Sequence, residues 1–471
     1  MYCRAFFYRT FFYRAFFYRT ACPPKTDHSD LFSHTLSAIL FLFLTSITAS
    51  VNASSRPAIT PLDTEPYSFK ELQQAIGFYQ TLNTLPWPVL RKTNKLLRLE
   101  DNHPDLAIMR HQLLLLGDLT APYTTPHNTS DNAADTDTKA NSAEYFDQHL
   151  EQALKHFQQR HGIKVDGILG PQSRKALNIS PAHRIQQLAL NIHRQNQFAD
   201  KASQRFIQVN IPEFRLRLFD QNELLLEMKT IVGRKTRKTP VFDTHIQALV
   251  INPSWNVPKS IAFKDILPRW QEDPEYLQRK NLQVLAGWNS SRPVPAEEID
   301  LTKMYQGNEY QRLWEPPGMG NTLGRIKFIS RSQYAIYLHD TSAPRLFDEH
   351  NRAFSSGCIR VAEARQLADT LLSLSEPEDV SLEPILSHSR TQTLPLQQPV
   401  NLHVTYWTAW ISPKGTLNFR EDLYKRDRWQ MQEHQQQLAE IIDKSSVPAP
   451  LETAQVALRQ VHQQSLDTQT E

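Results

Sequence analysis

The sequence lacks a strong excess of charge of either sign. Its 471 residues carry a formal net charge of only +3, and the lysines and arginines are scattered rather than gathered in one stripe. No recognition helix, RNA-binding signature or zinc-finger spacing is present, which argues against a nucleic-acid partner. The 17 histidines form no His-Glu-x-x-His pattern, which argues against a zinc peptidase. We therefore expect no metal and no other cofactor.

The N-terminal region also lacks a hydrophobic run long enough to span a bilayer comfortably. The apolar run from Thr35 to Thr48 suits a signal-peptide core, and Val51 and Ala53 have the small-residue spacing of a cleavage site. We therefore expect residues 1–54, which include a low-complexity five-residue repeat, to be a signal peptide for export. Their positively charged part is unusually long, so an uncleaved membrane anchor and a true start downstream of Met1 are the alternatives.

Cysteine is almost absent. The three cysteines are Cys3, Cys22 and Cys358, and the first two would leave with the signal peptide. A mature protein with one thiol cannot form an internal disulfide, so Cys358 is either a small buried hydrophobic residue or a reactive nucleophile. The count alone favours the buried residue, and the neighbouring sequence has to decide.

The pattern up to about residue 204 is helical. Leu150, Leu154 and Phe157 share one helix face, Gly162 suits a left-handed cap, and Pro171 suits the first position of a second short helix. The predicted segments are the first part of a helical scaffold at 55–120, a polar linker at 121–144, a small helical module at 145–180 and the second part of the scaffold at 181–204.

From about residue 205 to 425 the pattern changes to short strands, and we expect a mainly β domain there. An insertion at about 261–325, with helical pieces and a Pro/Gly-rich exit, resembles a lid over a site. Residues 426–471 read as a polar C-terminal tail. The predicted fold class is α+β.

The stretch RAFSSGCIRV, residues 352–361, contains the lone thiol. In the strand YAIYLHD, alternation places Tyr337 and His339 on one face, and Cys358 follows His339 by nineteen residues. An imidazole close to a thiol can take its proton and later protonate a leaving amine. Gly357 permits a sharp turn with backbone N–H groups free for an oxyanion, and a helix expected to begin near Val361 adds positive potential. Each feature alone is more often structural, but the combination favours a nucleophile.

These residues resemble a known family. The pattern His339-Asp-Thr, a loop and then SSGCIRV is similar to the active-site signature of the YkuD-type L,D-transpeptidases. The segments INPSWNVP and GNTLGRIKF are similar to the larger YcbB-like subfamily, whose members carry serine where the common motif has histidine, as Ser356 does here. The string FQQRHGIKVDGILGPQSRKAL resembles the peptidoglycan-binding type 1 domain.

The resemblance implies a role for each site residue. Cys358 would be the nucleophile, His339 the base and then the acid, and Tyr337 with the backbone N–H groups of Gly357 and Cys358 would line the oxyanion site. Substrate binding would fall to the neighbouring residues Ser356, Arg360 and Trp255. Arg360 would anchor a substrate carboxylate or make a structural salt bridge, and Trp255 would be a wall of the cleft or part of the core. Asp340 would orient His339 unless a backbone carbonyl does so.

The resemblance also implies a periplasmic acyltransferase of the EC 2.3.2 type that acts on peptidoglycan stem peptides. It would release D-Ala from a tetrapeptide stem and form a 3→3 crosslink, and carbapenems would inhibit it covalently. Three alternatives stay open at this point: an L,D-carboxypeptidase, a lipoprotein-anchoring enzyme, and a non-catalytic wall-binding scaffold with an inert Cys358.

Overall fold

The computed structural model describes residues 69–119, 143–199, 203–287, 290–295, 298–299, 311–375, 381–412 and 415–445. The chain divides into two units, residues 1–61 and 62–471, and the described residues all belong to the second. The predicted signal peptide, nearly all of the predicted linker and the end of the predicted tail lie outside the described residues. Across the described ranges, no helix has the length and apolar character that crossing a membrane requires.

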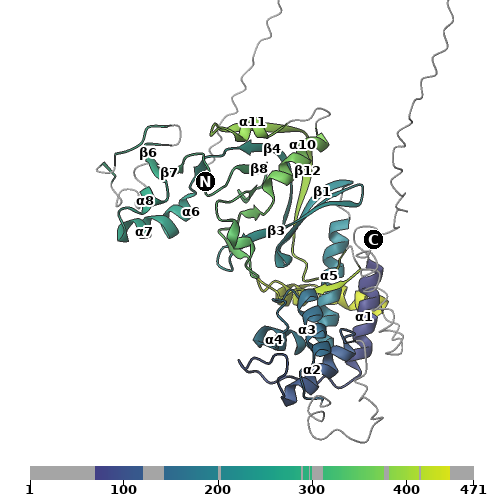
Figure 1. The fold of residues 1–471 in the computed structure, drawn as a ribbon. Coiled ribbons are helices and arrows are strands. Elements are labelled where there is room, and N and C mark those ends of the chain that lie inside the picture. Colours follow the sequence, from purple (N-terminus) through teal and green to yellow (C-terminus); the bar gives the residue numbers. More distant parts are fainter. Residues whose placement is uncertain are drawn as a thin grey trace, which may run out of the picture. The chain divides into compact units, whose positions relative to one another are not determined.

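The first region is helical, as the sequence predicts (Figure 1). Asp147 caps the N-terminus of the helix Gln148–Arg160 by accepting a hydrogen bond from the N–H of Leu150 at 2.7 Å. Gly162 follows that helix with φ +59°, and Pro171 begins the next one, where its missing N–H is not needed. The helices are α1 (Phe69–Asn83), α2 (Pro104–Leu115), α3 (Gln148–Arg160), α4 (Pro171–Leu177) and α5 (Pro181–Ala199).

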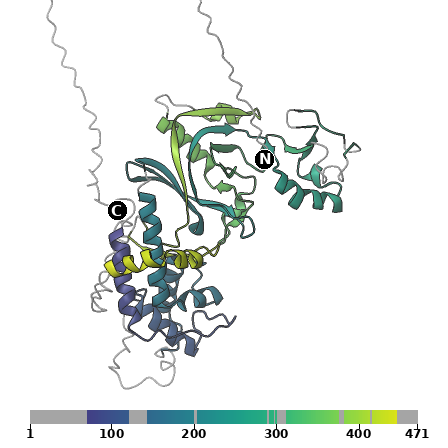
Figure 2. The same cartoon turned by 180° about the vertical axis from the view of Figure 1, so that it is seen from behind.

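The core of this helical region contains residues from far along the chain. The hairpin of β13 (Ala409–Ile411) and β14 (Leu417–Phe419) contributes Ala409, Leu417 and Phe419 to the apolar cluster formed by the helices. Helices α12 (Asp427–Glu433) and α13 (Gln435–Lys444), within the predicted tail, pack on α5 (Figure 2). The helical region is therefore completed by the C-terminal part of the described chain.

The mainly β region is one large sheet. Among the described residues its order is β10-β3-β11-β9-β8-β4-β12-β1-β2, and β3 also pairs with β2, so the sheet closes on itself. Its core combines strand residues with one face of α10 (Ala364–Ser375). The strands are β1 (Arg205–Asn210), β2 (Arg215–Asp220), β3 (Glu223–Gly233), β4 (Phe242–Ile251), β8 (Ile326–Ser330), β9 (Leu338–His339), β10 (Ala353–Ser355), β11 (Ile359–Val361) and β12 (Gln392–Thr405).

Between β4 and β8 the chain forms a smaller structure with its own apolar core, which we call the insertion (residues 255–315) (Figure 1). Strand β7 lies between β5 and β6 in its sheet. The elements are β5 (Trp255–Asn256), α6 (Lys259–Ile261), a π-helical turn η2 (Ala262–Ile266), α7 (Leu267–Glu272), α8 (Tyr276–Arg279), β6 (Gln283–Leu285) and β7 (Arg312–Glu315). The remaining short helices are η1 (Ile211–Glu213), η4 (Pro344–Phe347) and α11 (Glu383–Leu386).

The predicted α+β class, with a mainly β domain and a helical region, is confirmed. Two local predictions differ from the structure. The helix expected near Val361 begins at Ala364, because Val361 still pairs with Thr230 of β3. The strand expected from Tyr334 is only Leu338–His339, because Ala335 has a φ of +51° and interrupts the extended chain.

Candidate active site

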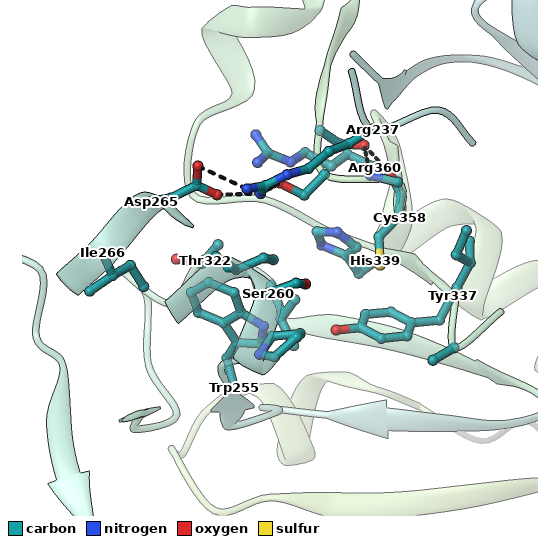
Figure 3. A pocket seen from close by; sticks show the side chains of 18 of the residues that line it. Arg237, Trp255, Ser260, Asp265, Ile266, Thr322, Tyr337, His339, Cys358 and Arg360 are labelled. Carbon is teal, nitrogen blue, oxygen red and sulfur yellow. Dashed lines mark hydrogen bonds and ion pairs between the residues drawn. The ribbon is translucent and has the colours of Figure 1, made fainter. Parts of the chain in front are cut away.

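A pocket of about 530 Å³ lies between the large sheet and the insertion. The sheet side contributes Tyr337, His339, Cys358 and Arg360, and the insertion contributes Trp255, Asp265 and Ile266 (Figure 3). Ser356 and Gly357 also line the pocket. The structure therefore brings together every site residue named from the sequence except Asp340.

Three hydrogen bonds hold the loop that carries Cys358 in place. The Ser355 hydroxyl accepts a hydrogen bond from the N–H of Gly357 at 3.0 Å and donates to the carbonyl of Cys358 at 2.5 Å. Thr239 donates to the carbonyl of Gly357 at 2.8 Å. Gly357 has a φ of +123°, which residues with a side chain rarely adopt. Because its N–H is bonded to Ser355, the N–H expected from Gly357 for an oxyanion is already occupied in this conformation.

His339 is buried, with an exposed fraction of 3%. Its Nδ1 lies 2.5 Å from the backbone carbonyl of Asp340. A carbonyl only accepts, so Nδ1 carries the proton and Nε2 is the basic nitrogen. Burial first, then the charges of Arg360 and Lys327, lower the pKa of His339 to about 3, against the contributions of two backbone carbonyls. The ring is therefore neutral at neutral pH and can act as a base.

The Asp340 carboxylate does not orient the imidazole. It accepts a hydrogen bond from the N–H of Arg325 at 2.8 Å and lies against Gly324 instead. The carbonyl of the same residue holds His339, which is the second of the two arrangements expected from the sequence. Burial raises the pKa of the Asp340 carboxyl, and bonds to N–H groups oppose this.

Cys358 is half-buried and is a free thiol. Burial raises the pKa of the Cys358 thiol, and the N–H of Tyr337 with the charges of Lys327 and Arg360 opposes this rise. Burial likewise raises the pKa of Tyr337, so its hydroxyl stays protonated and can donate a hydrogen bond. A neutral imidazole can accept a proton from a neutral thiol, so this pair has the groups that thiol activation requires.

Arg360 enters the pocket from β11. Its side chain is half-buried and its buried Nε has no hydrogen-bond partner. No carboxylate of the described residues forms an ion pair with it, so the salt bridge considered from the sequence is not seen there. An unpaired guanidinium in a pocket suits a ligand carboxylate, which it can bind through two hydrogen bonds.

Ser356 connects the cysteine loop with the insertion. Its hydroxyl accepts hydrogen bonds from Arg237 at 2.9 Å and from Arg234 at 3.4 Å. Both arginines also bind the carboxylate of Asp265 in the insertion, Arg234 at 3.2 Å and Arg237 at 3.1 Å. Figure 3 shows the contact between Arg237 and Asp265. Ser356 is thus part of the attachment of the insertion to the sheet. We call Arg234, Arg237 and Asp265 the clamp.

Sequence reasoning missed the clamp and Lys327. Lys327 stands in the quoted segment GNTLGRIKF, but its position opposite His339 depends on the pairing of β8 with β9. Alternation also places Tyr334 and Ile336 on the face away from Tyr337, whereas both line the pocket. The irregular backbone at Ala335 explains that difference. Among the described residues, no group of three or more His, Cys, Asp or Glu side chains could hold a metal ion.

The pocket places a free thiol, a neutral imidazole and a protonated tyrosine together, and two regions of the chain match known domains. Residues 204–393 match the L,D-transpeptidase catalytic domain called YkuD, and residues 132–177 match a peptidoglycan binding domain. The chain is 35% identical over 243 residues to a Haemophilus influenzae protein named L,D-transpeptidase. The match covers 52% of this chain, and the chain spans about half the length of that curated relative, 48%.

Two solved L,D-transpeptidase structures show a much weaker likeness. That from Stackebrandtia nassauensis is 10% identical with a TM-score of 0.23, covering 67% of this chain and 97% of that one. That from Xylanimonas cellulosilytica is 10% identical with a TM-score of 0.20, covering 67% and 100%. We base no conclusion on structural similarity with TM-scores this low. The family matches show that this chain contains a YkuD-type L,D-transpeptidase catalytic domain and a peptidoglycan-binding type 1 domain.

Proposed function

We propose that this protein is a peptidoglycan L,D-transpeptidase that uses Cys358 as its nucleophile. One observation carries the proposal: a single pocket in a YkuD-type domain contains a thiol, a neutral buried imidazole, a protonated tyrosine and an unpaired guanidinium. The peptidoglycan-binding domain supports the choice of substrate. The relative named L,D-transpeptidase supports the choice of reaction.

The first half-reaction moves one proton and exchanges one bond. His339 takes the thiol proton while the sulfur of Cys358 attacks the carbonyl of the third stem residue, normally diaminopimelate. The tetrahedral oxyanion would accept a hydrogen bond from the Tyr337 hydroxyl and from the N–H of Cys358. As the carbonyl re-forms, the bond to D-Ala breaks, and the imidazolium gives its proton to the departing amine. The products are a thioester and D-Ala.

The second half-reaction reverses these roles. A diaminopimelate side-chain amine attacks the thioester, His339 takes the amine proton, and the sulfur leaves and regains a proton. The product is a 3→3 crosslink. Arg360 would hold a substrate carboxylate, and Trp255, on the insertion side, would form a wall against the stem. The protein would work in the periplasm after export, cleaved or anchored through residues 1–54, and would react covalently with carbapenems.

The acyl acceptor decides between this reaction and its nearest alternatives. Purified protein would be incubated with tetrapeptide muropeptides and the products measured by mass spectrometry. Dimers indicate transpeptidation, tripeptides alone indicate an L,D-carboxypeptidase, and adducts with an added lipoprotein indicate an anchoring enzyme. Cys358→Ala should abolish D-Ala release in all three cases. Release that survives this substitution would refute the nucleophile, and no release by the unaltered protein would favour the non-catalytic scaffold.

A further inference from the structure

Lys327, His339 and Arg360 occupy paired positions on three adjacent strands next to the Cys358 loop. Lys327 of β8 is paired with His339 of β9, and His339 is paired with Arg360 of β11. Paired residues point to the same face of a sheet. The imidazole is therefore flanked by two cations, one on each neighbouring strand.

Lys327 lies behind the ring of Tyr337. Its Nζ is 3.9 Å from the centre of that ring, a cation–π distance, and its side chain is half-buried. In the described part of the chain no carboxylate forms an ion pair with it. Burial lowers the pKa of this ammonium group, and among the described residues a negative charge on Cys358 would counteract the shift. The half-buried Lys327 ammonium group is therefore compensated by an opposite charge only when the Cys358 sulfur is negative.

We propose that Lys327 is a positioning residue of this site, which favours the Cys358 thiolate through its charge and holds the Tyr337 ring in place by the contact of its ammonium group. The inference rests on the proposed function, because it describes how the same cysteine is made reactive. Lys327 does not line the pocket, so it acts through its neighbours and not by touching substrate.

The charge of Lys327 acts on both partners of the proton transfer. It stabilises negative sulfur and disfavours a positive imidazole. With Arg360 on the other side, a proton taken up by His339 lies between two cations and passes readily to the departing amine. The arrangement thus makes His339 a base that does not retain its proton.

The test is the pH dependence of thiol alkylation, which needs no peptidoglycan. Full-length protein would react with iodoacetamide from pH 6 to pH 10, and mass spectrometry would quantify the adduct on the Cys358 peptide. Lys327→Met removes the charge and keeps the length of the side chain. We expect the midpoint of the profile to rise by about one pH unit, and alkylation at pH 7 to slow roughly tenfold.

Matched variants separate charge from packing. Lys327→Arg keeps the charge and should restore most of the wild-type profile. Lys229→Met, in strand β3, which β11 and β9 separate from β8, should leave the profile unchanged. If Lys327→Met does not fold, as judged by circular dichroism, Lys327→Gln takes its place with the same expected shift. An unchanged midpoint in the neutral variant would refute the proposal, and so would an arginine variant that shifts as far as the neutral one.

The two proposals fail in different ways. D-Ala release tests the reaction with substrate, and alkylation tests the environment of the thiol alone. A shifted profile without D-Ala release would leave Lys327 as a modulator of Cys358 and would reject the transpeptidase. Normal D-Ala release with an unshifted profile would support the transpeptidase and would reject the role of Lys327.

Discussion

Breaking the clamp should open the pocket to large molecules while leaving the chemistry of the thiol unchanged. Asp265 in the insertion binds Arg234 and Arg237, and its side chain is 28% exposed. Exposed ion pairs contribute about 0.2–1 kcal/mol each, so two of them on one carboxylate hold the insertion with roughly 0.4–2 kcal/mol. Asp265→Asn removes the charge, so the population with the insertion detached should rise about 2- to 30-fold.

Two thiol reagents of different size measure this opening. Iodoacetamide is small, and a polyethylene-glycol maleimide enters only when the insertion moves away. Both react with the thiolate, so the ratio of their rates at Cys358 cancels any change in the thiol pKa. In Asp265→Asn we expect the ratio of the bulky-reagent rate to the small-reagent rate to rise about 2- to 30-fold. High salt should raise it in the wild-type protein as well.

A matched substitution in the same insertion provides the control. Asp273 pairs with Arg279, both within the insertion, and does not contact the sheet through this pair. Asp273→Asn should therefore leave the ratio of rates unchanged. An Asp265→Asn ratio equal to that of Asp273→Asn would show that the clamp does not hold the insertion closed.

Three further outcomes follow from the structure. Arg360→Met should lower kcat/KM for a tetrapeptide about 10- to 100-fold, chiefly through KM, the loss expected for a charged hydrogen bond of about 1.5–3 kcal/mol, with Arg360→Lys in between. Phe419→Ala, at a side chain that is 1% exposed, should lower the free energy of unfolding in urea by about 3–5 kcal/mol. Between pH 6.5 and about 3 the unfolded chain binds a proton at His339 that the folded chain does not, so stability should fall with acid. The loss from pH 7 to pH 5 should be roughly 2 kcal/mol greater in the wild type than in His339→Asn.

The residues near Cys358 could be predicted because they are local in the sequence or share one strand. Tyr337 and His339 are two positions apart, and alternation places them together. The lone thiol and its glycine identify the loop. Arg360 was expected in the site because of the resemblance to the family motif. These inferences need only the period of one strand, the cysteine count and a short motif.

The rest of the site depends on contacts that no local pattern encodes. Lys327 faces His339 through strand order, and Asp265 meets Arg237 only because the insertion folds back over the sheet. The N–H of Gly357 was expected to face an oxyanion, but Ser355, two residues away, accepts its hydrogen bond. This local side-chain bond competes with an oxyanion for the same N–H, and the strand alternation does not reveal it.

The hairpin in the helical core has a consequence for synthesis on the ribosome. Helices α1 to α5 emerge first, yet Phe419 and Leu438, which complete their core, are translated only after every strand of the large sheet. The buried side chain of Gln187 in α5 likewise donates to the carbonyl of Thr408 at 3.1 Å. Part of the apolar core surface of these helices therefore stays exposed until the sheet has been translated. The contacts that finally cover it join parts of the chain that are far apart in the sequence. Folding should be slow and should depend on protection from aggregation until the last helix is released.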